Sequence, residues 1–154
     1  MQYFSSHAII RWKDFVLYNE DNPDMGPMPP GGLFNSIELK ELSKIDSKDE
    51  KQRIELSKKV LQRELQEEMH LQPNIETFLR YIQDTSFVGD SGKVYHYDGM
   101  YFWRVDLPSL DIGAIYLQTG IVHDYLHISK IDERIKSEAI KNTIRLYFSN
   151  FSPV

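Results

Sequence analysis

The chain has 154 residues, of which 41% are hydrophobic, and a formal net charge of −5. This length suits one compact domain with a single core and leaves no room for a separate partner domain. Because cysteine is absent, disulfides, thiol catalysis and cysteine zinc sites are excluded. The negative net charge disfavours general binding to a nucleic-acid backbone but permits binding of a nucleotide through a bridging metal ion.

Two apolar runs near the beginning of the chain predict β-strands. Residues 7–12 and 15–18 are rich in isoleucine, valine and aromatic side chains, and they flank a turn at residues 13–14. The next segment, residues 19–30, holds four prolines and one glycine, which predicts a loop.

An acidic helix is predicted around Glu64, Glu67 and Glu68. These glutamates stand at i, i+3 and i+4, so they share an arc about 100° wide and could bind one cation or a small cluster. Leu61 and Leu65 recur on the adjoining arc and can bury against a sheet. Three like charges this close repel one another unless Mg²⁺ or Mn²⁺ binds between them or water screens them. Taken alone, the pattern is also that of a solvated helix face.

The second half of the chain contains further β-type runs. Residues 75–88 and 93–105 flank the Gly-Asp-Ser-Gly segment at 89–92, which predicts a β-hairpin. Residues 115–118 and 122–128 predict two shorter strands.

A terminal amphipathic helix is predicted from Ile140, Ile144 and Phe148, which recur every four residues and should pack on the sheet. Strands, then a helix, then more strands and a final helix predict an α+β fold with a mixed sheet between helices.

The residues around the acidic helix resemble the box of the Nudix hydrolase family. That box reads glycine, five residues, glutamate, seven residues, then Arg-Glu-aliphatic-x-Glu-Glu-x-Gly-aliphatic. The chain matches its second half, with the correct spacing, at Glu55, Arg63, Glu64, Leu65, Glu67, Glu68 and Leu71. The resemblance covers roughly residues 6–148, and it implies the α/β/α sandwich of the Nudix fold in a single domain, residues 1–154.

Two departures from the box accompany this match. Asp49 stands where the box has its first glycine, while the diglycine Gly31-Gly32 lies further upstream, so we expect an insertion at about 34–50. The inserted residues should form a strand end or helical element beside the cleft rather than extend the acidic helix. His70 occupies the position where the box has the glycine that ends the helix. We expect it to cap the helix with a positive φ, which costs about 1 kcal/mol of stability relative to glycine.

The position of Glu55 is left open. If one helix runs on from a capping box at Ser47, Glu55 lies on the side opposite to Glu64. If Ser57 caps a new helix, Glu55 lies in the preceding loop and can fold back toward the other glutamates. The family pattern favours the second geometry, and local propensity does not decide.

The resemblance implies a metal-dependent pyrophosphohydrolase that cleaves a nucleoside diphosphate linked to another moiety into a nucleoside monophosphate and a phosphorylated product. Glu64, Glu67 and Glu68 supply hard oxygen ligands for Mg²⁺ or Mn²⁺, which would neutralise the pyrophosphate and acidify the attacking water. Arg63 would brace a glutamate or contact a phosphate. The alternative is a catalytically silent Nudix-like domain that binds a nucleotide as a sensor.

Candidates for substrate contacts are fewer. The backbone of Gly31-Gly32 lets a phosphate approach closely because no side chain intervenes. Arg11 could reach a phosphate from the first strands or be an ordinary surface arginine.

The general base is either one of the box glutamates or a carboxylate beyond the hairpin. We choose Asp124 among the latter, against the alternative of a surface residue. His123 and His127 would share one strand face, but two histidines without a third ligand seldom bind zinc.

The expected partner is a small nucleotide substrate. The first residues lack a signal-peptide pattern and no run approaches the ~18 apolar residues of a membrane span, so we expect a cytoplasmic protein without a membrane partner. No basic run favours nucleic acid, and a homodimer is left open.

Overall fold

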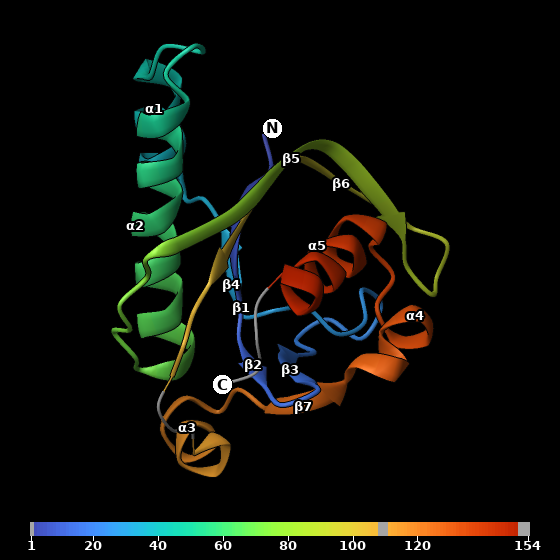
Figure 1. The fold of residues 1–154 in the computed structure, drawn as a ribbon. Coiled ribbons are helices and arrows are strands. Elements are labelled where there is room, and N and C mark those ends of the chain that lie inside the picture. The colour runs from blue at the N-terminus through green and yellow to red at the C-terminus, as the bar shows by residue number, and fades with distance from the viewer. Residues whose placement is uncertain (1, 108–110, 151–154) are drawn as a thin grey trace.

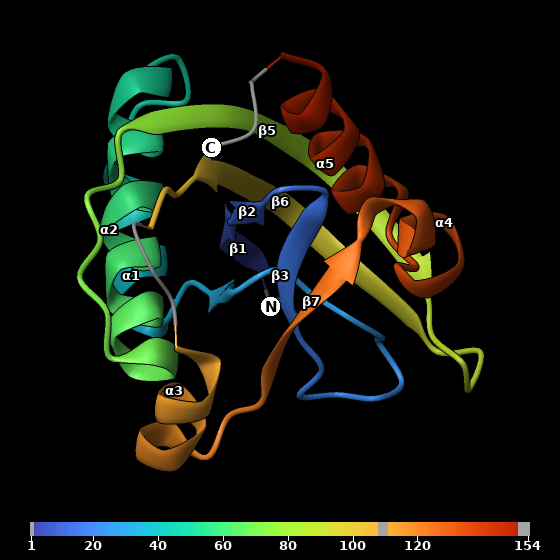
Figure 2. The same cartoon turned by 60° about the horizontal axis from the view of Figure 1, so that its bottom comes forward.

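The computed structural model describes residues 2–107 and 111–150. In this part of the chain, helices lie on both sides of a four-stranded mixed sheet, and a three-stranded sheet packs beside it (Figure 1, Figure 2). The predicted α+β fold with a mixed sheet between helices is confirmed. None of the helices in the described residues has the length and apolar character needed to cross a membrane.

The larger sheet has the order β4 (Gly31–Leu33), β1 (Phe4–Ile9), β6 (Val94–Arg104) and β5 (Thr77–Val88). Strands β1 and β6 are parallel, and the other neighbouring pairs are antiparallel. Strands β5 and β6 form the hairpin that the sequence predicts around residues 89–92.

The smaller sheet has the order β2 (Arg11–Trp12), β3 (Phe15–Asn19) and β7 (His123–His127), with both pairs antiparallel. The tight turn between β2 and β3 holds Lys13 at a φ of 51°. The register of β3 and β7 sets Asn19 directly opposite His123.

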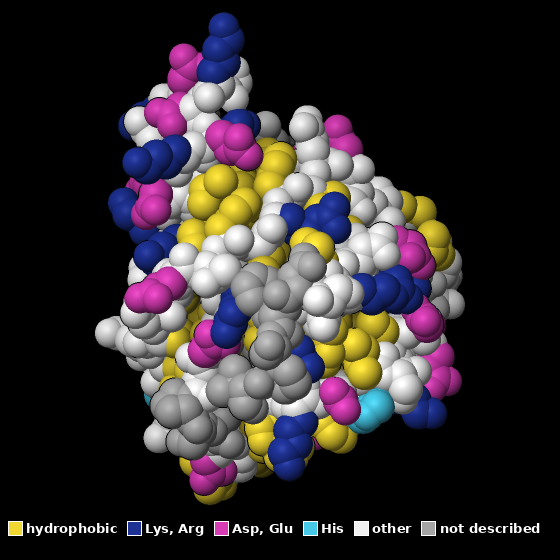
Figure 3. Space-filling view, in the orientation of Figure 1, with side chains coloured by type: hydrophobic (Ala, Val, Ile, Leu, Met, Phe, Trp, Pro, Cys, Tyr) yellow, Lys and Arg dark blue, Asp and Glu magenta, His cyan; other side chains and the backbone are white. Residues whose placement is uncertain are grey.

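The acidic helix, α2 (Glu50–Met69), is preceded by a separate helix, α1 (Ser36–Lys44). Asn35 caps the start of α1 through a capping box with Glu38. The helix ends at Ile45, where the backbone is extended. Helix α1 is thus the helical element that we predicted within residues 34–50. That these residues are an insertion relative to the family stays a prediction. On the face drawn in Figure 3, acidic and basic side chains cover these helices.

The geometry that we favoured for Glu55 is wrong. Asp49 caps α2, and the helix continues without a break through Ser57, whose hydroxyl donates to the Ile54 carbonyl inside the helix. Buried side chains on both sides of Ser57, such as Leu56 and Val60, hold these turns against the rest of the protein. Glu55 is therefore exposed on the side of α2 opposite to the glutamate cluster.

The predicted strand at 115–118 is also wrong, because these residues belong to α3 (Ile112–Thr119). The Asp111 carboxylate accepts a hydrogen bond from the Ala114 N–H at the start of α3, and Gly120 ends it at a φ of 74°. Ile115 packs against the apolar side of α2. A short apolar run does not distinguish a strand from a buried helix turn, and here the cap and the packing decide.

The remaining elements are a 3₁₀ helix, η1 (Ile128–Lys130), and two helices, α4 (Ile131–Arg134) and α5 (Glu138–Asn150). The predicted terminal helix is confirmed: Ile140 and Ile144 of α5 are fully buried in one core. His70 ends α2 in the left-handed conformation, with φ 53°, as predicted.

Alternate residues of β6 fill the two sides of the sheet. Met100 and Phe102 face the core under α5, whereas Tyr101 and Trp103 face α2. The Trp103 indole N–H donates to the buried Ser57 hydroxyl at 2.9 Å, which joins the sheet to α2 by a polar contact inside an apolar core.

We predict that Ser57→Ala lowers the free energy of unfolding by about 1–3 kcal/mol, because the buried Trp103 N–H would lose its acceptor. Urea denaturation followed by Trp fluorescence measures the change. The matched control is Ser43→Ala on α1, whose exposed hydroxyl donates to a carbonyl of its own helix and which should change stability by less than about 0.5 kcal/mol. Equal effects of the two substitutions would contradict this role of Ser57.

Candidate active site

The three glutamates lie in the last turns of α2, beside β4, and differ in their exposure. The side chains of Glu64 and Glu68 are 13% and 11% exposed, whereas that of Glu67 is 60% exposed. The structure thus brings two of the three predicted ligands into the protein and leaves the third at the surface.

The diglycine of β4 makes this burial feasible. A Cβ on Gly32 would lie 2.7 Å from the carboxylate of Glu64, so glycine leaves room for this carboxylate in its present position. Gly31 has a φ of 137°, and a Cβ there would lie 2.1 Å from the Ser6 carbonyl oxygen. The contact of Gly31-Gly32 with a phosphate stays a prediction, since a glutamate carboxylate adjoins Gly32 in this structure.

Arg63 holds the first two glutamates. Its Nη1 donates to Glu67 at 3.0 Å and lies 3.1 Å from Glu64 Oε1. Its Nε and Nη2 donate to the two oxygens of Glu38 at 3.0 and 2.7 Å, and Nη2 also donates to the Leu33 carbonyl. This geometry fits the bracing role. Sequence reasoning missed Glu38, although the Asn35-x-x-Glu38 spacing of a capping box was visible.

Glu68 has a different set of neighbours, contributed by both sheets. Its Oε2 accepts hydrogen bonds from the Asn19 side chain at 3.2 Å and from the Gly31 N–H at 3.4 Å. The same oxygen lies 3.9 Å from His123 Nε2. Asn19 and His123 face Glu68 together because they are directly opposite on β3 and β7.

The buried carboxylates resist ionisation. Burial raises the pKa of Glu64 to about 7, although the Arg63 charge opposes this change. Burial also raises the pKa of Glu68, against the opposing effects of His123 and the Gly31 N–H. Two hard oxygen donors that are only partly neutralised by the protein suit a divalent cation, which would supply the missing positive charge.

His123 lies beside Glu68, a contact that the sequence did not predict. Its side chain is fully buried, and neither ring nitrogen has a hydrogen-bond partner among the described residues. An unpaired buried polar group costs about 1–3 kcal/mol, so such a group beside a carboxylate indicates a ligand-binding role. His127 does not join it, because its Nδ1 lies 2.8 Å from the Ser129 hydroxyl.

Two further candidates lie away from the glutamates. The Arg11 guanidinium stacks on Phe148 of α5, 3.9 Å from the ring centroid, and its Nε donates to the Lys13 carbonyl. Asp124 is exposed and follows His123 on β7, so its side chain points to the opposite face of the strand. It borders a cavity of about 330 Å³ with Tyr18 and Asp21.

No protein-family model and no curated relative matches the chain, but solved structures match over nearly its full length. A Nudix hydrolase from Nitrosomonas europaea aligns over 99% of this chain and 93% of its own, with a TM-score of 0.60 at 17% identity. The E. coli dihydroneopterin triphosphate pyrophosphohydrolase aligns over 96% of each chain, with a TM-score of 0.61 at 15% identity. The C. elegans Ap4A hydrolase aligns over 97% of this chain and 98% of its own, with a TM-score of 0.52 at 14% identity. These likenesses establish the fold.

We predict that Glu64→Gln stabilises the protein in the presence of a chelator, increasingly as the pH rises. Between about pH 4.5 and 7, Glu64 keeps its proton in the folded protein but loses it in the unfolded chain, because folding raises its pKa. The free energy of unfolding of the wild type therefore falls as the pH rises through this window. Glutamine does not ionise. The free energy of unfolding of Glu64→Gln, measured by urea denaturation at a series of pH values, should exceed that of wild type by an amount that grows to on the order of 1–2 kcal/mol above about pH 7, after allowance for solvent screening. A difference that shrinks with rising pH would contradict the burial of this charge.

We also predict that His123→Leu raises the free energy of unfolding by about 1 kcal/mol, because it removes two buried nitrogens that lack hydrogen-bond partners among the described residues. Loss of the 3.9 Å contact between Nε2 and Glu68 opposes part of this gain. The control is His127→Leu on the same strand, which loses hydrogen bonds to Ser129 and should not stabilise. Urea titrations of the metal-free proteins measure both changes. If His123→Leu destabilises more than the control, the ring makes a hydrogen bond in solution.

Proposed function

Because the chain has the Nudix fold, we propose that it is a divalent-metal-dependent pyrophosphohydrolase. It would cleave a nucleoside diphosphate linked to another moiety into a nucleoside monophosphate and a phosphorylated product. The observation that carries this proposal is the pair of buried carboxylates, Glu64 and Glu68, set against the diglycine strand. The names of two structural neighbours, a pyrophosphohydrolase and an Ap4A hydrolase, describe hydrolysis of the same general kind of compound.

Glu64, Glu67 and Glu68 would hold Mg²⁺ or Mn²⁺. The bound cation supplies the positive charge that a pyrophosphate needs and lowers the pKa of the attacking water. The chain's own residues prepare the ligands: Arg63 fixes Glu64 and Glu67, which limits the repulsion between them. Asn19 holds the third carboxylate from the side of the small sheet.

The nucleotide would occupy the cavity of about 330 Å³ that Tyr18, Asp21 and Asp124 line. The charge of Asp21, which lines the cavity, raises the pKa of Glu68, and this supports a location near the carboxylates. Tyr18 and Asp124 lie on the face of the small sheet opposite to Asn19 and His123. Tyr18 offers a ring face for a nucleobase. Asp124 remains our proposed general base, at the rim of the cavity rather than on the cluster. The cytoplasmic location and a homodimer stay predictions.

We predict that Glu67→Gln and Glu68→Gln each lower turnover at least ~10²-fold under limiting Mg²⁺, because each removes a charged ligand. Glu55→Gln on the same helix is the matched control, since Glu55 is exposed on the opposite side and should retain wild-type turnover. Hydrolysis of nucleoside triphosphates, dinucleotides and nucleotide sugars, followed by chromatography of the products, provides the measurement. Near-normal turnover of both site variants would refute the assignment.

The same assay tests the alternative function. Cleavage that requires the metal and disappears in Glu67→Gln supports the enzyme. Tight nucleotide binding without turnover across the whole panel would instead identify a nucleotide-binding domain.

A further inference from the structure

A second cavity, of about 410 Å³, lies at the other end of α2. It is open to solvent and is lined by the end of α1, the α1–α2 connection, the first turns of α2, the N-terminal strand and the middle of the β5–β6 hairpin. Arg53 lines it, and eleven residues separate Arg53 from Glu64, which is about 16 Å along a helix. This cavity is therefore separate from the glutamate cluster. Its volume falls within the roughly 300–1,000 Å³ of small-ligand sites.

Arg53 gives this cavity a positive charge that forms no ion pair with a carboxylate of the described residues. Its Nε is buried and has no hydrogen-bond partner among the described residues. Two carboxylates line the same cavity, but each has another neighbour: Asp98 accepts from the Tyr3 N–H at 2.7 Å, and Asp84 lies 3.6 Å from His96 Nε2. A half-buried arginine whose Nε lacks a partner, and which forms no ion pair with the described residues, suits an external anion.

The wall beside Arg53 is aromatic. The rings of Tyr81 and Tyr101 lie 4.5 Å apart. A Cβ on Gly99 would come within 2.8 Å of the rings of both Phe4 and Tyr81, so glycine at this position leaves room for both rings. Burial raises the pKa of Tyr81, and that of Tyr101 to about 12, which keeps both phenols neutral. Tyr81 remains half-buried, which leaves part of its ring available for a ligand.

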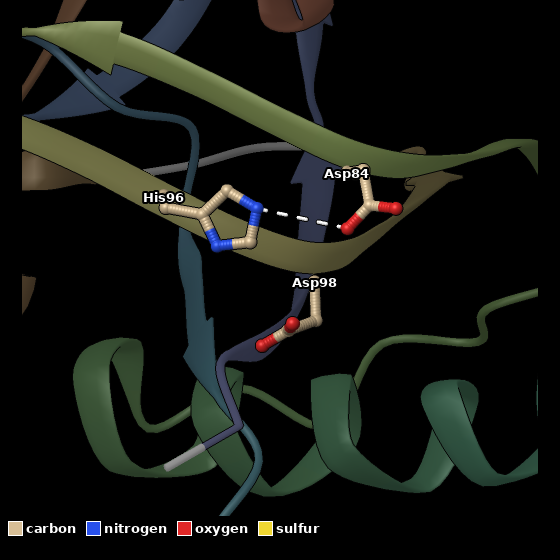
Figure 4. Close-up of side chains that lie close together, drawn as sticks. All are labelled: Asp84, His96 and Asp98. Carbon is tan, nitrogen blue, oxygen red and sulfur yellow. Dashed lines mark ion pairs between the residues drawn. The ribbon is translucent and has the colours of Figure 1, made fainter.

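The outer rim of the cavity is acidic. Asp84, His96 and Asp98 come from the two strands of the hairpin, and one ligand atom from each lies within 4.8 Å of the others (Figure 4). His96 and Asp84 form an exposed ion pair, while Asp98 adds a second carboxylate. This rim favours a positively charged group at the mouth of the cavity.

We propose that this cavity binds a small aromatic amino acid. Its carboxylate pairs with Arg53, its ring lies against Tyr81, and its ammonium group faces Asp84 and Asp98. Such a ligand satisfies the inner positive charge and the outer negative charge together, and it contacts α1, α2 and the hairpin at once.

Calorimetric titration of the full chain with three matched compounds tests this proposal. L-phenylalanine carries both charges, 3-phenylpropionate carries only the anion, and phenethylamine carries only the cation. We expect L-phenylalanine to bind at least ~10-fold more tightly than either analogue, since each charged contact contributes on the order of 1.4 kcal/mol. Equal affinity for the three compounds, or no heat of binding at about 10 mM, overturns the proposal.

Two substitutions locate the compounds in the cavity. Arg53→Met should weaken L-phenylalanine and 3-phenylpropionate about tenfold and leave phenethylamine unchanged, whereas Asp84→Asn should weaken L-phenylalanine and phenethylamine only. Lys51→Met, an exposed position on the same helix outside this cavity, is the matched control and should bind as wild type. Unchanged affinity of Arg53→Met for L-phenylalanine places the ligand elsewhere and refutes the site. Far-UV circular dichroism verifies that each variant is folded.

Discussion

The guanidinium of Arg63 is the interaction on which the candidate active site depends. It contacts Glu38 of α1, the Leu33 carbonyl of β4, and two glutamates of its own helix. The hydrogen bonds from Arg63 to the Glu38 carboxylate raise the pKa of Arg63 above its usual value, so the guanidinium stays charged at every pH at which the protein is folded. The Arg63 guanidinium therefore holds both α1 and β4 against α2, and its positive charge offsets the repulsion between Glu64 and Glu67.

The site is also a junction between the two sheets. Glu68 contacts Gly31 of the larger sheet and Asn19 of the smaller one, and His123 approaches the same oxygen. Any change in the packing of one sheet on the other alters the surroundings of this carboxylate. The geometry of the cluster is thus set by tertiary structure and not by the helix alone.

The sequence predicted the features that depend on local chemistry. The i, i+3, i+4 spacing fixed the shared arc of the glutamates, the Gly-Asp-Ser-Gly segment fixed the β5–β6 hairpin, and His70 took the positive φ expected of a residue in place of glycine. The resemblance to the family box also predicted the fold, which a 3.6-residue period alone does not specify.

The errors and omissions arose where distant segments decide the structure. The start of α2 was misassigned because the sequence offered caps at Ser47 and at Ser57, and only burial of the turns around Ser57 shows that the helix passes through it. Residues 115–118 have an apolar pattern that fits strand or helix equally. The contacts of Arg63 with Glu38 and of Glu68 with His123 join residues far apart in the chain, and no periodicity reports such contacts.

The parallel pairing of β1 with β6 has a consequence for how the protein is made. Tyr3 and Asp98, which hydrogen-bond to each other at one end of this pair, are 95 residues apart in the sequence. During synthesis the first strand emerges from the ribosome long before the strand that it pairs with, and closing so long a loop is costly in entropy. Its apolar residues Ala8 and Ile9 lack their partners on β6, Trp103 and Arg104, until those residues have been translated. The parallel pair therefore forms late, and until then the edge of β1 that faces β6 stays open to pairing with other chains.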